Sequence, residues 1–95
     1  MFDITLEEVK EMIFPLSQNA KLEVGTLYDE KTGYSVALES ALLCANEYQT
    51  VEEFYAYIDK SKSFVFPGGP EFAKFTKGYR QGLKDVLLHI DQFKQ

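Results

Sequence analysis

The sequence has no tryptophan, one cysteine and one histidine among its 95 residues. A single cysteine cannot form an internal disulfide, which favours a reducing compartment, and we expect a cytoplasmic protein. One histidine without a Cys-x-x-Cys pair leaves a metal site short of ligands. No apolar run approaches the roughly 20 residues that span a bilayer, and the first residues do not resemble a signal peptide. We therefore expect no metal, no cofactor and no membrane association.

What the chain does contain is typical of one small globular domain. Hydrophobic residues make up 45 % and charged residues 26 % of the sequence, values that argue against disorder or a coiled-coil rod. A chain of this length supports one core, so residues 1–95 are expected to form a single domain. Eight Phe and six Tyr supply the large side chains that such a small core needs. Most of these aromatics are expected to be buried.

Three segments have helical signals. Thr5 and Glu8 fit a capping box, and the helix that follows is expected to end near Ile13 because Pro15 comes next. Thr50 and Glu53 form a second capping box ahead of a short helix over 51–59. A long helix is expected from Pro70 to about Phe93. Its apolar residues fall within about a third of its circumference: Phe72, Phe75, Tyr79, Leu83, Val86, Leu87, Ile90 and Phe93.

The segment between the first two helices resembles a β-hairpin. Apolar and polar residues alternate over 21–28 and again from Tyr34 to Leu38. The Asp29–Gly33 sequence between them is typical of a type I turn closed by glycine. Residues 39–48 are compatible with a helix or a strand, and we favour a strand to Leu42.

The run Ser63–Phe66 is β-prone and could add a third strand. The predicted fold class is therefore α+β. It comprises an N-terminal helix, an antiparallel hairpin of two or three strands, a short helix, and a long C-terminal helix packed on the sheet.

Few residues suggest catalysis. Cys44 and His89 could pair only if the fold brought them together, and the apolar neighbours of Cys44 are typical of an inert thiol. Asp85 lies four residues before His89, a spacing that favours a salt bridge or solvent contact. The carboxylate pairs fall in first helical turns or in the expected hairpin turn, where capping and the helix dipole account for them. We expect no enzymatic activity.

The distribution of charge is more informative than its total of −5. Residues 1–47 carry a net charge of −6 and residues 48–95 a net charge of +1. The predicted acidic face for binding a partner consists of Glu7, Glu8, Glu11, Asp29 and Glu30. The long helix has an opposite, basic side that could bind phosphates. This alternative nucleic-acid face consists of Lys74, Lys77, Arg80 and Lys84.

Two glycines inside the long helix need an explanation, because each costs a helix interior about 1 kcal/mol relative to alanine. Gly78 and Gly82 are four residues apart and share one side of the helix, which lets another backbone approach closely. One interpretation is packing within the molecule. The other is a homodimer or a partner helix that docks on a groove formed by Gly78, Gly82, Asp85 and His89.

Together these observations predict a non-enzymatic, acidic interaction module that binds a protein partner. One concrete form is an inhibitor or regulator of a nucleic-acid-handling enzyme, of the kind found among accessory proteins of mobile elements, whose carboxylates compete for a basic cleft. The alternative is direct nucleic-acid binding through the basic side of the long helix.

Overall fold

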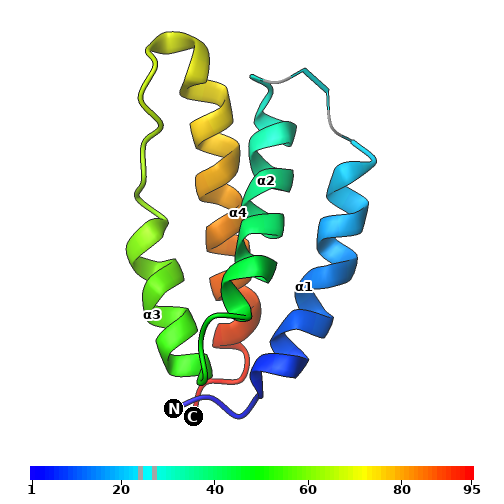
Figure 1. Ribbon diagram of the computed structural model, residues 1–95, viewed down its shortest axis with the longest axis vertical. Helices are drawn as coiled ribbons and strands as arrows, with labels where there is room; N and C mark the ends of the chain where they lie inside the picture. Colours follow the sequence, from blue (N-terminus) through cyan, green and yellow to red (C-terminus); the bar gives the residue numbers. More distant parts are fainter. Residues whose placement is uncertain (24, 27) are drawn as a thin grey trace.

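The computed structural model describes residues 1–23, 25–26 and 28–95. Four α-helices run alternately up and down, and both chain ends lie together at one end of the bundle (Figure 1). The helices are α1 (Leu6–Lys21), α2 (Glu30–Ala45), α3 (Val51–Ser61) and α4 (Ala73–Asp91), with a 3₁₀ turn η1 (Pro70–Phe72) leading into α4. We call the end with the two termini the lower end of the bundle.

The α+β prediction is wrong: the described residues contain helices and a single isolated bridge, between Phe2 and Lys94, but no strand. The expected turn at residues 29–33 is the beginning of α2, where Asp29 caps the helix by accepting a hydrogen bond from the N–H of Lys31. The expected return strand and the ambiguous segment after it are helical to Ala45. Of the expected first strand over 21–28, positions 24 and 27 lie outside the described residues, Lys21 is the last residue of α1, and the others belong to the α1–α2 connection.

The close approach of α2 and α4 explains why α2 is a helix. These two helices run in the same direction at the centre of the bundle, with α1 and α3 on either side (Figure 1). A Cβ added to Gly33 would overlap the carbonyl oxygen of Phe75, and one added to Gly78 would overlap that of Glu30. Backbone therefore meets backbone, and the long C-terminal helix packs on α2 instead of on a sheet.

Both predicted capping boxes are confirmed. The Thr5 hydroxyl accepts the N–H of Glu8 at 3.1 Å while the Glu8 carboxylate accepts the N–H of Thr5 at 3.0 Å. Thr50 and Glu53 form the same reciprocal pair at the start of α3. Each pair satisfies backbone donors that the first helical turn leaves free.

The predicted end of the first helix near Ile13 is wrong, because α1 continues through Pro15 to Lys21. A proline inside a helix removes one backbone hydrogen bond and costs about 3 kcal/mol. Pro15 is on the exposed side of α1, so water can reach the carbonyl group that loses its partner. Ile13 and Ser17 on the opposite side are buried. The buried residues before and after Pro15 in the sequence thus keep the helix continuous.

The connection between α3 and η1 is not the expected third strand. The Phe66 ring packs edge-on against both Phe75 and Tyr79, with ring centroids 4.9 Å apart in each case. Arg80 donates hydrogen bonds to the carbonyl oxygens of Ser63 and Phe64 at 2.7 and 3.1 Å. Side chains of α4 thus make the bonds that a neighbouring strand would have supplied.

The core includes residues from all four helices. Its largest fully buried side chains come from α3 (Phe54 and Ile58), α1 (Ile13), α2 (Leu38) and α4 (Leu83 and Ile90). No helix among the described residues is long and apolar enough to cross a membrane.

Ser17 is a flaw in this core and the subject of a first prediction. Ser17 is 1 % exposed, and its hydroxyl has no hydrogen-bond partner among the residues that the structure describes. Because a buried unsatisfied hydroxyl costs about 1–3 kcal/mol, Ser17→Ala is expected to raise the free energy of unfolding by about 1 kcal/mol or more. Urea denaturation measures this. Gln18→Ala on the exposed side of α1 is the control and should gain only a few tenths of a kcal/mol from helix propensity; equal gains would contradict the prediction.

Candidate functional site

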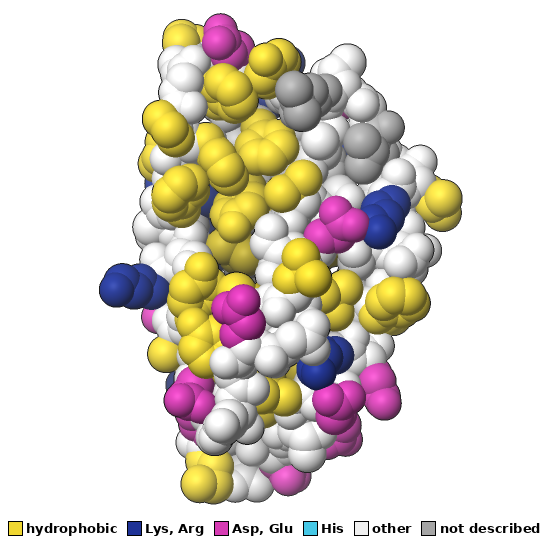
Figure 2. Space-filling view, in the orientation of Figure 1, with side chains coloured by type: hydrophobic (Ala, Val, Ile, Leu, Met, Phe, Trp, Pro, Cys, Tyr) yellow, Lys and Arg dark blue, Asp and Glu magenta, His cyan; other side chains and the backbone are white. Residues whose placement is uncertain are grey.

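The lower end of the bundle is strongly acidic. It brings together the beginnings of α1 and α3 and the ends of α2 and α4 (Figure 1). Eight acidic side chains lie in these segments against two basic ones, Lys10 and Lys94, while the rest of the molecule has a net charge of +1. The acidic residues are Asp3, Glu7, Glu8, Glu11, Glu47, Glu52, Glu53 and Asp91. Several acidic side chains gather at this end of the face shown in Figure 2.

Several of these carboxylates are held in place by backbone donors. Glu8 and Glu53 belong to the capping boxes, and the Glu52 carboxylate accepts the N–H of Phe2 at 3.0 Å. Hydrogen bonds from its own backbone and from Phe2 hold the pKa of Glu52 below its ordinary value. These carboxylates therefore stabilise helix beginnings and also fix negative charge at one end of the molecule.

The five acidic residues predicted to form one face do not lie together. Glu7, Glu8 and Glu11 are at the lower end, whereas Asp29 and Glu30 begin α2 at the opposite end (Figure 1). There Asp29 caps the helix, and Glu30 lies 3.5 Å from the ammonium group of Lys77.

Sequence reasoning missed the five acidic residues that join the first three at the lower end, namely Asp3, Glu47, Glu52, Glu53 and Asp91. The second capping box was a usable signal for Glu52 and Glu53. In an up-and-down bundle, the beginnings of the first and third helices lie at the same end. The mistaken hairpin concealed this relation.

An apolar groove follows the line of contact between α1 and α2. Phe14, Leu42 and Leu43 line a hollow of about 470 Å³ together with Lys10, Glu11 and Asn46. Phe14 is 55 % exposed and Leu43 is 70 % exposed, so two large apolar side chains stand in solvent beside this hollow. Apolar side chains also interrupt the charged ones on this face in Figure 2. We call this hollow the α1–α2 groove.

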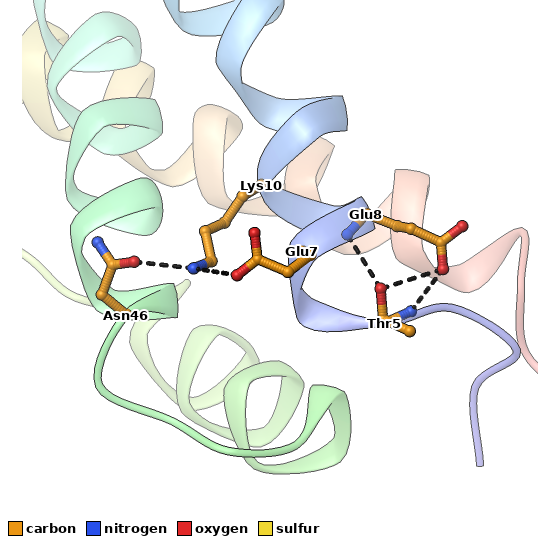
Figure 3. A network of polar contacts seen from close by, with 5 residues as sticks. All are labelled: Thr5, Glu7, Glu8, Lys10 and Asn46. Atoms are coloured by element: carbon orange, nitrogen blue, oxygen red, sulfur yellow. Dashed lines mark hydrogen bonds and ion pairs between the residues drawn. The ribbon is translucent and has the colours of Figure 1, made fainter.

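A polar network closes the lower end of the α1–α2 groove (Figure 3). The Lys10 ammonium group donates to the Glu7 carboxylate and to the side-chain oxygen of Asn46, both at 2.9 Å, and so links α1 to the end of α2. Higher along the same pair of helices, Lys21 and Glu39 form an ion pair with a 2.6 Å separation. The apolar part of the groove lies between these two cross-links.

The predicted glycine groove is largely occupied by the molecule itself. Gly78 and Gly82 are buried against α2, and a Cβ on Gly82 would come within 2.7 Å of the Ala37 Cβ. Asp85 accepts hydrogen bonds from the Tyr34 hydroxyl at 2.6 Å and the Gln81 amide at 2.8 Å, and His89 is half-buried. Of the two interpretations of these glycines, the structure therefore shows packing within the molecule.

The basic residues predicted to form one face make separate contacts. Arg80 holds the 62–69 connection through two carbonyl groups, and Lys77 lies near Glu30. Lys74 and Lys84 are exposed. Lys74 lines a hollow together with Asp29 and Glu71, and Lys84 lines another together with Asp59 and Asp91. Carboxylates therefore interrupt the positive charge along α4.

Cys44 and His89 are not brought together in a cleft. Half-buried Cys44 lines a cavity of about 30 Å³ with Ser40, Tyr57 and Tyr79, and His89 is not among the residues that line it. Within the described part of the chain, no three His, Cys, Asp or Glu side chains are grouped so that they could hold a metal ion.

Another hollow, of about 560 Å³, lies between the end of α1, the beginning of α2 and α4. Tyr34 lines it, and burial together with the hydrogen bond to Asp85 raises the pKa of Tyr34 to about 12. On the other side of α4, the hydrogen bond from Tyr55 to Asp91, together with burial, raises the pKa of Tyr55 to about 12. Both phenols are thus committed to carboxylates and remain protonated donors at neutral pH.

These two tyrosines make stability sensitive to alkaline pH. Their folded pKa values of about 12 exceed the ordinary value of 10, so the folded state holds more protons between these limits. Their contribution is complete below about pH 10 and is lost as the pH rises to about 12. The free energy of unfolding should therefore fall more steeply over this range than in Tyr34→Phe/Tyr55→Phe, as measured by urea denaturation. Equal slopes would contradict the assignment.

Comparison with protein-family models, curated proteins and solved structures finds no match for this chain. The class of protein is therefore defined by the fold itself: a small, acidic chain whose described residues form a bundle of alternating up and down helices. Its candidate functional surface is the acidic lower end with the adjoining α1–α2 groove.

Proposed function

We propose that this chain is a non-enzymatic, cytoplasmic interaction module that binds a basic surface of a protein partner through its acidic lower end. The observation that carries the proposal is the concentration of charge: a net charge of −6 at one end of a molecule whose remainder carries +1. Such an asymmetry attracts a positively charged surface and orients the molecule as it approaches.

A protein that binds nucleic acid is the partner class that fits this end best. Its basic cleft is built to bind phosphate groups, and carboxylates held by capping hydrogen bonds present the same sign of charge at little cost in conformational entropy. Occupation of the cleft by the acidic end would exclude the nucleic acid. If that partner is an enzyme that acts on nucleic acid, the present chain would then act as its inhibitor or regulator.

A pull-down comparison tests the proposal. Glu7→Gln/Glu11→Gln/Glu47→Gln removes three exposed charges from the lower end without touching either capping box. The control Glu23→Gln/Glu30→Gln/Glu71→Gln changes the net charge equally at other exposed positions. A partner captured by the unmodified protein and by the control, but lost by the first variant, is the expected result. Equal capture by both variants would refute binding through the acidic end.

Direct nucleic-acid binding is the second candidate, supported by the exposed Lys74 and Lys84 on the outer side of α4. Titration with DNA and RNA at low salt separates the two functions. Micromolar binding that weakens steeply with salt and is lost in Lys74→Gln/Lys84→Gln would favour this second candidate. We expect no such binding, because each lysine lines a hollow together with two carboxylates.

A further inference from the structure

The α1–α2 groove has the features of a docking site rather than of an ordinary helix surface. Two large apolar side chains, Phe14 and Leu43, stand more than half exposed on either side of a hollow lined mainly by carbon. Exposed apolar residues are common one at a time, but a pair that flanks a concave apolar surface is typical of an interaction site.

The charges around the groove indicate which partner it would accept. Glu11 lines the groove, and Glu7 lies beside it, bound to Lys10. Lys10 also lines the groove, but its charge is balanced by Glu7 at 2.9 Å. The lower edge of the groove is thus continuous with the acidic end, and its field favours a cationic segment.

The groove itself is lined from Lys10 to Phe14 on α1 and from Leu42 to Asn46 on α2, and the Lys21–Glu39 ion pair marks the upper limit of the α1–α2 contact that a helix could follow beyond it. From Lys10 to Lys21, α1 rises about 16 Å at 1.5 Å per residue. About three turns of a helix laid along the line of contact would cover this distance. Apolar side chains at i, i+3 or i+4, and i+7 on such a helix would face Phe14, Leu42 and Leu43, as in recognition of an amphipathic helix by a groove.

We propose that the α1–α2 groove binds a cationic amphipathic helix of the partner, whose apolar side enters the groove while Lys or Arg side chains reach Glu11 and the acidic lower end beside it. This rests on the proposed function, since it names the partner element that the acidic end attracts. A second copy of this chain is a poor occupant because it would bring another net charge of −5 to the same surface.

A designed peptide probes the groove directly. It has about 18 residues, or five helical turns at 3.6 residues per turn, with leucines along one side and lysines elsewhere. A scrambled peptide of the same composition has the same charge but no apolar side. We expect the amphipathic peptide to bind at least tenfold more tightly than the scrambled one by calorimetry or fluorescence anisotropy.

Variants locate the binding. Leu43→Ser is expected to weaken the amphipathic peptide about tenfold, a change of about 1.4 kcal/mol. The control is Leu88→Ser, since Leu88 is similarly exposed at 62 % but lies on α4 beside Tyr55 and Asp91. Leu88→Ser should leave the affinity unchanged. Both positions are on the surface, so thermal melts should show both variants as stable as the unmodified protein.

The possible outcomes separate this inference from the proposed function. If both peptides bind equally and Leu43→Ser changes neither affinity, the groove is not the site, but attraction of cations by the acidic end still stands. If neither peptide binds even at low salt, both proposals fail. A dimer in sedimentation experiments that Leu43→Ser dissociates would assign the groove to a second copy and overturn the inference.

Discussion

Gly78→Ala is expected to cost about 3 kcal/mol or more of the free energy of unfolding, a large share of the roughly 5–14 kcal/mol typical of a domain of this size. The new methyl group would overlap the carbonyl oxygen of Glu30 and come within 3.0 Å of the backbone nitrogen of Tyr34. Backbone atoms of a helix cannot turn aside as a side chain can, so α2 and α4 would have to separate. Urea denaturation followed by circular dichroism measures the loss.

The opposite outcome is expected if the site is not crowded. In that case replacing a helical glycine by alanine stabilises the protein by about 1 kcal/mol. A stabilised or unchanged Gly78→Ala variant would therefore show that α2 and α4 do not touch here. Gly82 provides a graded comparison: its added Cβ would meet the Ala37 Cβ at 2.7 Å and the Tyr34 carbonyl oxygen at 3.0 Å. Gly82→Ala should cost less than Gly78→Ala, and Ala37→Gly in the same chain should recover part of that cost.

The same contact explains which elements were predictable from the sequence. α1, α3 and α4 have capping residues or a one-sided apolar pattern, and these local signals were interpreted correctly as helices. α2 is packed between the other helices, so its apolar residues are spread around its circumference and show no clear helical period. α2 has a row of small residues, Gly33, Ala37 and Ala41. This row predicts a helix only once it is known to pack against Gly78 and Gly82 of α4.

Some local sequence signals led to a wrong prediction because the same residues are typical of two different structures. Asp29 followed by Gly33 suits a hairpin turn, yet Asp29 is a helix cap and Gly33 is the site where a carbonyl group approaches. Pro15 is a stop signal that the packing of its neighbours overrides. Such competition between local preference and tertiary contact cannot be decided from one segment alone.

The candidate site was predictable only in part for the same reason. The acidic character of Glu7, Glu8 and Glu11 was visible, because they share the first turns of one helix. Their grouping with Glu47 and Glu52 depends on α2 being a helix that returns to the lower end, where the hairpin prediction had placed a strand. The α1–α2 groove could not be predicted, since Leu42 had been placed at the end of a strand and not on a helix beside α1.

Phe54→Ala is expected to have the other large effect, because α3 depends on few contacts. At 11 residues, α3 is shorter than the roughly 12–15 residues at which isolated helices become even marginally stable in water. Its hold on the bundle comes from Val51, Phe54 and Ile58, and Phe54 is the largest fully buried side chain of the chain's described part. Removing a buried phenyl ring typically costs about 3–5 kcal/mol.

The loss should be concentrated in α3 rather than shared evenly. α2 and α4 contact each other through backbone atoms at Gly33 and Gly78. Without Phe54, α3 keeps the smaller buried side chains Val51 and Ile58, the hydrogen bond from Tyr55 to Asp91, and the bond between Glu52 and the N-terminal segment. Amide hydrogen exchange should therefore show α3 losing protection in Phe54→Ala while α2 and α4 retain most of theirs. Tyr57→Ala, at a 43 % exposed position of the same helix, is the control and should cost less than about 1 kcal/mol. Equal loss of protection in all helices would instead mean that α3 unfolds only with the α2–α4 pair, as one cooperative unit.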